Sequence, residues 1–80
     1  MRKSLHSPEY LVFCALMTQT RKKAGLTQQA LAQRLGRPQS FVAKYEGGER
    51  RLDVIEFMTV ARAMGADPVL LLRTLSKRRS

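Results

Sequence analysis

The sequence has little of several things on which other proteins depend: one cysteine, one histidine, no tryptophan and only 6 acidic residues. Cys14 and His6 cannot form a disulfide or a multi-ligand metal site within one copy of the chain. We expect Cys14 to be a small buried apolar side chain and His6 to be exposed to solvent. No apolar run approaches the roughly 18 residues that span a bilayer, the longest being residues 11–17. With no cleavable signal either, the sequence predicts a cytoplasmic protein that is neither secreted nor inserted in a membrane.

The 80 residues leave room for one domain, residues 1–80, which is too small for a large enzyme architecture. No GxxxxGK[ST] loop occurs, and no nucleophile and base lie in recognisable spacing, so we expect no catalysis, no small-molecule substrate and no cofactor. The 15 lysines and arginines against 6 acidic residues give a formal net charge of +9 at pH 7. Such a field concentrates polyanions, so charge favours nucleic acid as partner, with an anionic membrane surface or simple solubility as alternatives.

Glycine, proline and capping signals divide the sequence into five short segments, none with the alternating pattern of a strand. The clearest start is that of the fourth helix, where Asp53 and Glu56 have the spacing of a capping box. Ser7, Thr27 and Asp67 are the expected N-caps of the first, second and fifth helices. The expected helices are residues 8–24, 28–35, 38–46, a fourth from its cap at 53 to 65, and a fifth from its cap at 67 to about 75, with a frayed basic tail at 76–80. The sequence therefore predicts an all-α bundle.

Residues 27–46 form the segment that points to a function, because they predict two short helices separated by a turn of about three or four residues. Ala32 lies where a larger side chain would push the two helix axes apart, and Gly36 can adopt the positive φ that an abrupt reversal needs. At about 100° per residue the second helix has two distinct sides. The inner side carries Phe41, Val42 and Tyr45, and the outer side carries Gln39, Ser40, Ala43 and Lys44. Taken alone, such a polar face is usually only solvated.

A family resemblance over residues 21–72, roughly two thirds of the sequence, favours a functional role for this polar face. The sequence resembles the phage repressor and Cro-like, or XRE-type, helix-turn-helix family in the stretches L-T-Q-Q-A-L-A-Q-R-L-G, P-Q-S-F-V-A-K-Y-E-G-G-E-R and L-D-V-I-E-F. The resemblance implies a compact five-helix lambda-repressor-like fold. It also implies that residues 38–46 enter the major groove of DNA and that residues 28–35 lie across the backbone.

Base reading is the role that the resemblance implies for Gln39, Ser40 and Lys44. The chemistry agrees, since glutamine can pair with adenine, lysine can donate to guanine and serine is adaptable. Phosphate contacts are implied for Gln28, Arg50 and Arg51. Arg37 departs from the family because its turn site is usually apolar, and we expect it to reach a phosphate instead. The residues implied to shape the motif are Ala32, Gly36 and Val42, together with an Arg21 and Glu46 pair that ties the first helix to the end of the recognition helix.

The first and fifth helices contain more apolar residues than one small core can hide. The core can use Phe13, Met17 and part of residues 69–72. The side chains left for another protein surface are Leu11, Val12, Leu70 and Leu75. We therefore expect a homodimer through these two helices, which would place two recognition helices about 34 Å apart on a palindromic operator.

Charge, outer face and resemblance together favour a sequence-specific double-stranded DNA-binding transcriptional regulator at the nucleoid. We expect a repressor, because no separate activation or ligand domain is evident in the sequence. A near alternative is an antitoxin or a restriction-modification controller protein with the same fold, whose apolar surface would bind a toxin or contact polymerase. A more distant alternative is a protein or RNA adaptor that retains only the architecture.

Overall fold

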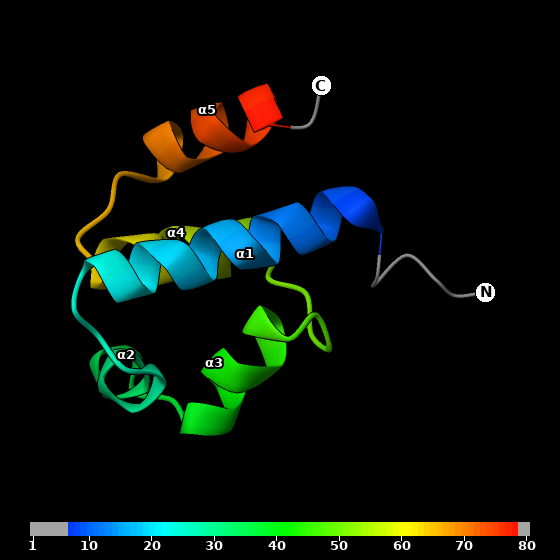
Figure 1. Cartoon of the computed structure of the whole chain (residues 1–80). Coiled ribbons are helices and arrows are strands. Elements are labelled where there is room, and N and C mark those ends of the chain that lie inside the picture. Colours follow the sequence, from blue (N-terminus) through cyan, green and yellow to red (C-terminus); the bar gives the residue numbers. More distant parts are fainter. Residues whose placement is uncertain (1–6, 79–80) are drawn as a thin grey trace.

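Five α-helices make up residues 7–78, the part of the chain that the structure, a computed structural model, describes (Figure 1). They are α1 Pro8–Lys23, α2 Gln28–Leu35, α3 Gln39–Glu46, α4 Val54–Ala63 and α5 Pro68–Arg78. No strand occurs within those residues. The expected all-α, five-helix fold is therefore confirmed.

The helix starts follow the capping residues that the sequence supplies. Ser7 Oγ accepts the backbone N–H of Tyr10 at 3.1 Å, and Thr27 Oγ1 accepts that of Ala30 at 3.0 Å. At α4 the capping box is complete, because the Asp53 side chain accepts from the Glu56 backbone and the Glu56 side chain accepts from the Asp53 backbone. These bonds satisfy amide donors that the first turn of a helix otherwise leaves without partners.

Four helix bounds differ from the sequence-based expectation. α1 ends at Lys23 and α4 at Ala63, slightly before the expected residues 24 and 65, and the start of α3 and the end of α5 also differ. α3 begins at Gln39 and not at residue 38, because Pro38 has the extended backbone of an N-cap, with a ψ of 154°. α5 continues to Arg78, so the prediction that it ends near residue 75 is wrong. Leu75 packs against the core and anchors the last turn, and the basic Lys77 suits the carbonyl end of a helix. Residues 79 and 80 of the expected tail lie outside the described residues.

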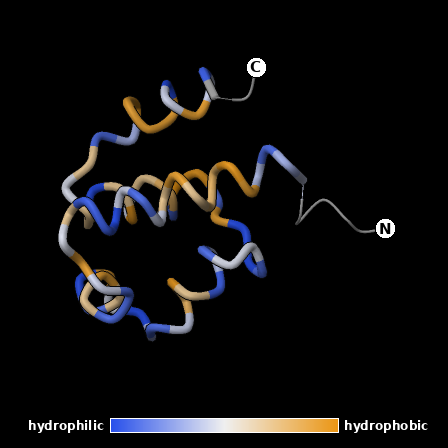
Figure 2. The backbone as a smooth tube through the Cα atoms, viewed as in Figure 1, coloured by the Kyte–Doolittle hydropathy of each residue, from blue (hydrophilic) through white to orange (hydrophobic). Residues whose placement is uncertain are grey.

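α1 lies at the centre of the fold, with α2 and α3 on one side of it, α5 on the other and α4 behind it (Figure 1). The hydropathy of the residues, coloured along the chain in Figure 2, agrees with this arrangement. Hydrophobic stretches lie in α1 and α5, and the connection between α2 and α3 is hydrophilic. The core contains a set of large side chains with almost no exposure: Met17, Leu31, Val42, Tyr45 and Val60. Because the core occupies the inner side of α3, the outer side of that helix remains in solvent.

The remaining chemistry-bearing residues are few. Cys14 is buried, as expected, and its Sγ donates to the carbonyl oxygen of Tyr45 at 3.2 Å. His6 lies outside the described residues. Within residues 7–78 no group of three or more histidine, cysteine or acidic side chains is placed to hold a metal ion. None of the five described helices is both long and apolar enough to cross a lipid bilayer.

Candidate nucleic-acid interface

The outer face of α3 is polar and exposed to solvent. Gln39, Ser40, Ala43 and Lys44 are all exposed, whereas Phe41, Val42 and Tyr45 are buried. The sharp turn before α3 depends on Gly36, whose φ of 66° lies in the left-handed region that glycine adopts without strain. Ala32 is 2% exposed, in keeping with a site that only a small side chain fits. A helix held by its inner side therefore presents three polar side chains that can donate or accept hydrogen bonds.

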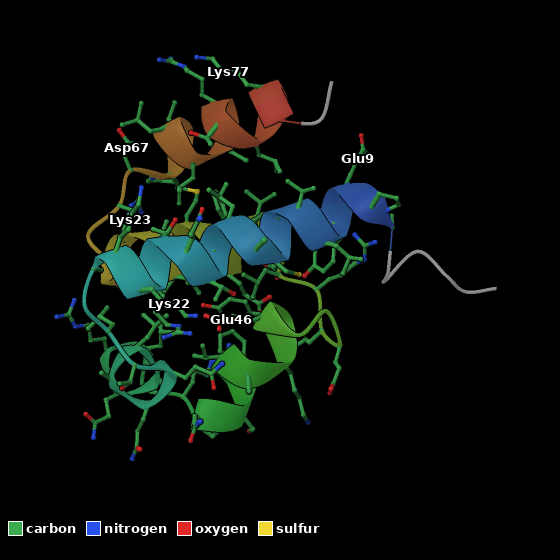
Figure 3. All side chains as sticks on the ribbon, in the orientation of Figure 1. Glu9, Lys22, Lys23, Glu46, Asp67 and Lys77 are labelled. Carbon is green, nitrogen blue, oxygen red and sulfur yellow. The ribbon has the colours of Figure 1, made fainter. Side chains whose placement is uncertain are left out.

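An ion pair fixes the end of α3 to α1. Arg21 Nε donates to Glu46 Oε2 at 2.7 Å, and Arg21 Nη2 donates to Glu46 Oε1 at 3.1 Å. Figure 3 shows Glu46 between the ribbons of α1 and α3. Arg21 Nη1 also donates to the carbonyl oxygen of Leu26 at 2.8 Å, which ties in the connection from α1 to α2. The hydrogen bonds to Glu46 raise the pKa of Arg21, so this guanidinium stays charged.

Gln28, at the start of α2, extends this pair to the start of α3. Its Nε2 donates to Glu46 Oε1 at 3.0 Å, and its Oε1 accepts from Gln39 Nε2 at 3.2 Å. One N–H of the Gln39 amide is thereby occupied, and its Oε1 and second N–H remain to meet a base. The structure thus places Gln28 as a link that orients Gln39. Its contact with a phosphate stays a prediction.

Arg50 and Arg37, both expected to hold phosphates, gather around Glu56. Arg50 donates to both Glu56 oxygens, at 3.0 and 2.8 Å, and Arg37 Nη2 lies 3.7 Å from Glu56 Oε2. The hydrogen bonds from Arg50, and then that from the Asp53 backbone, lower the pKa of Glu56 to about 2. The carboxylate is therefore ionised at neutral pH, and it offsets part of the positive charge of the two arginines.

Tyr10 connects the chain segment after α3 to α1, and sequence reasoning missed it. Its hydroxyl donates to the carbonyl oxygen of Arg50 at 3.0 Å, and the guanidinium carbon of Arg51 lies 4.3 Å from its ring centroid. Arg51 itself is exposed. No spacing in the sequence reports this contact, because Tyr10 and Arg50 are separated by 40 positions.

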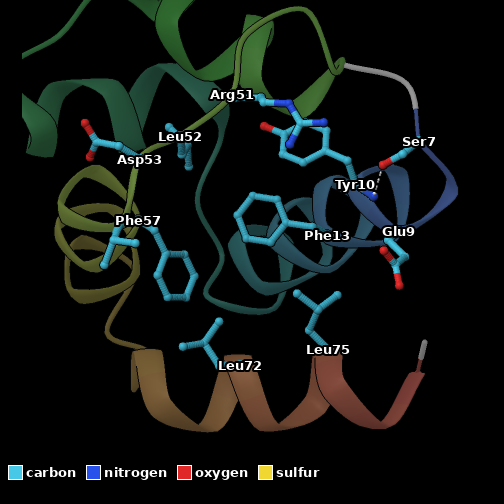
Figure 4. A pocket seen from close by; sticks show the side chains of 11 residues that line it. Ser7, Glu9, Tyr10, Phe13, Arg51, Leu52, Asp53, Phe57, Leu72 and Leu75 are labelled. Carbon is cyan, nitrogen blue, oxygen red and sulfur yellow. Dashed lines mark hydrogen bonds between the residues drawn. The ribbon is translucent and has the colours of Figure 1, made fainter. Parts of the chain in front are cut away.

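The apolar surface is wider than the sequence predicts. Of the four expected interface residues, Leu11 and Leu70 are 44% and 54% exposed, while Val12 and Leu75 are half-buried. Leu75 instead packs on the core and, with Phe13, Phe57 and Leu72, lines an open cavity of about 350 Å³ (Figure 4). The exposed apolar residues that were not expected to form an interface are Val54, Ile55, Val69 and Leu72.

The fold and the face on α3 define a class, that of the helix-turn-helix proteins. The profile of a family described as a helix-turn-helix domain matches residues 13–74. A solved structure of an XRE-family like protein from Pseudomonas syringae pv. tomato str. DC3000 is similar to this chain, with 51% sequence identity and a TM-score of 0.84 over 90% of this chain and 88% of that chain. No curated protein matches the chain significantly. The chain belongs to the XRE-type helix-turn-helix family of DNA-binding domains.

Proposed function

We propose that this protein is a sequence-specific transcriptional repressor that binds a palindromic operator as a homodimer. The observation that carries the proposal is the outer face of α3, where Gln39, Ser40 and Lys44 are exposed. The end of this helix is tied to α1 by the pair of Arg21 and Glu46, and the Gln39 amide is oriented by Gln28. A rigid helix with such side chains can meet base edges in the major groove at about 1 to 3 kcal/mol per good two-point contact. The high positive charge adds attraction to phosphates of any sequence.

Selection of bound duplexes from a random oligonucleotide pool tests the proposal directly. We expect a palindromic site with half-sites about one helical turn apart. Gln39→Ala and Lys44→Ala should each relax the preference at one position in each half-site. Gln19→Ala, which changes an exposed glutamine on α1, should leave the preference unchanged. If Gln39→Ala and Lys44→Ala leave both affinity and base preference unchanged, a protein or RNA adaptor is the better description.

The proposed dimer contact uses the edge of α1 and α5 that carries Leu11, Val12 and Leu70. Leu75, the fourth residue expected there, lies only about 60° from Leu72 around α5 and lines the cavity with it. Leu70 and Leu72 are similarly exposed, at 54% and 51%, but lie about 200° apart around α5, on either side of the buried Leu71. We expect Leu70→Glu to give a monomer in light scattering. Leu72→Glu is the matched control on the opposite edge and should stay dimeric.

Two other results would change the assignment. If only the Leu72→Glu variant dissociates, the dimer interface lies on the edge of α5 beside the cavity. If the parent protein is monomeric at micromolar concentration, the homodimer proposal is wrong, and the apolar surface is better explained as a contact with another protein. That second candidate, an antitoxin or controller protein, is favoured by the open apolar cavity beside α5.

A further inference from the structure

Two arginines share one aromatic ring beside the start of α3. The guanidinium carbons of Arg37 and Arg50 lie 4.3 and 4.8 Å from the centroid of the Phe41 ring, which is on α3 and is almost fully buried. A guanidinium group stacks favourably on an aromatic face, so the ring restrains both side chains. We call Arg37, Phe41 and Arg50 the arginine clamp.

Glu56, in the first turn of α4, contacts both arginines of the clamp. Its carboxylate accepts two hydrogen bonds from Arg50 and lies within ion-pair distance of Arg37. The same carboxylate accepts the backbone N–H of Asp53 at 3.0 Å and is only 18% exposed. Glu56, at the start of α4, thus restrains the side chains of Arg37 and Arg50, which would otherwise sample many rotamers.

The clamp keeps hydrogen-bond donors for a further anion. Of the five N–H groups of an arginine, Arg50 uses two for Glu56 and a third for the carbonyl oxygen of Arg51 at 3.0 Å. Its Nε–H and its second Nη2–H make no hydrogen bond with the described residues, and they lie on one edge of the guanidinium plane. The side chains of Arg37 and Arg50 are 45% and 39% exposed. Phosphate oxygens can therefore approach this edge without displacing Glu56.

We propose that the arginine clamp binds one phosphate group of the DNA backbone and that Glu56 is its positioning residue. This inference rests on the proposed DNA-binding function and adds to it a role for a carboxylate that touches neither base nor phosphate. A phosphate held by the clamp lies beside the first turn of α3, which carries Gln39 and Ser40. Its binding would therefore anchor the start of the recognition helix to the DNA backbone without reading sequence itself.

If Glu56 acted only through charge repulsion, its removal would have the opposite effect on DNA binding. A carboxylate near DNA repels phosphates, so its removal should strengthen binding to every sequence. Glu49 is the matched control, because it is exposed on the same connection between α3 and α4 and makes no side-chain hydrogen bond or ion pair with the described residues. Glu49→Gln and Glu56→Gln each remove one negative charge, but only the second loosens the clamp.

The test measures the dissociation constants of the full chain for its selected operator and for an unrelated duplex over a series of salt concentrations. We expect Glu49→Gln to bind both duplexes about two-fold more tightly, because repulsion falls. Glu56→Gln should bind both about ten-fold more weakly, keep the ratio between them, and show a salt slope smaller in magnitude by about 0.9, the value of one lost phosphate contact. Circular dichroism at the titration temperature shows whether the variants are folded.

The decisive comparison repeats Glu56→Gln in an Arg50→Ala background. Without Arg50 the carboxylate makes no hydrogen bond to the clamp and keeps only its 3.7 Å contact with Arg37. Charge repulsion then dominates, so Glu56→Gln should now tighten binding about as much as Glu49→Gln does. This reversal of sign is an effect that partial unfolding would not produce. Tighter binding by Glu56→Gln in the otherwise native chain overturns the inference while leaving DNA binding intact. A parent that binds no duplex at low salt overturns the proposed function and the inference with it.

Discussion

Arg21 and Glu46 form a two-point ion pair between α1 and the end of α3, with side chains that are only 9% and 6% exposed. Removal of one partner from such a pair leaves a buried charge without compensation, which costs far more than the net value of the pair. The pair therefore sets the position of α3 relative to α1.

Replacement of Arg21 by methionine should lower the free energy of unfolding by about 3 to 5 kcal/mol, measured by urea denaturation. The double variant Arg21→Met with Glu46→Leu should recover much of that loss, because no charge is then buried alone. Lys22→Met, which changes the exposed neighbour, should alter stability by less than about 0.5 kcal/mol. A loss below about 1 kcal/mol in Arg21→Met would contradict a positioning role for the pair.

The link from Gln28 to Gln39 predicts that a residue on α2 affects base preference on α3. Gln28→Ala removes the acceptor for Gln39 Nε2, so the Gln39 amide can turn. We expect the discrimination at the base that Gln39 reads to fall by about 1 kcal/mol, measured by binding to operators with single substitutions. Gln33→Ala, an exposed glutamine on the same helix, is the control. An unchanged preference in Gln28→Ala, beside a lost one in Gln39→Ala, would show that the link does not orient the amide.

The sequence was a good guide to helix starts, because they depend on neighbours within four positions. The capping box of Asp53 and Glu56 and the cap at Thr27 are of this kind. The two sides of α3 follow from helical periodicity in the same way. The pair of Arg21 and Glu46, 25 positions apart, came only from the family resemblance, since no local rule connects such residues.

Contacts across irregular connections could not be predicted in this way. Glu56 was interpreted only as a capping residue, yet it also binds Arg50, six positions away and outside any helix. Whether two such residues meet depends on the backbone path of residues 47–53, including a positive φ at Gly48 that composition does not reveal. The same limit applies to α5, because anchoring of its last turn depends on how Leu75 meets the core.

The hydroxyl of Tyr45 is buried and has no hydrogen-bond partner among the described residues. Burial without a partner is unfavourable and also raises the pKa of this phenol. Tyr45→Phe should therefore raise the free energy of unfolding, by up to about 1 kcal/mol in urea denaturation. Tyr10→Phe is the matched comparison and should lower it by about 1 kcal/mol, since that hydroxyl donates to Arg50. A clear loss of stability in Tyr45→Phe would indicate a bound water that satisfies the hydroxyl.

The ion pair of Glu56 with Arg50 predicts how stability depends on acid. Because the pKa of Glu56 is lowered from 4.5 to about 2 in the folded chain, the unfolded chain takes up the proton first. The stabilisation from this group is complete above pH 4.5 and is lost as the pH falls towards 2. Over this pH range we expect the free energy of unfolding to fall by on the order of 1 kcal/mol, since the pair is partly exposed and screened by solvent. Urea denaturation at pH 6 and pH 3 should show a smaller loss in Glu56→Gln than in the parent, whereas Glu49→Gln should lose as much as the parent. An equal loss in both variants would mean that other carboxylates account for the acid sensitivity.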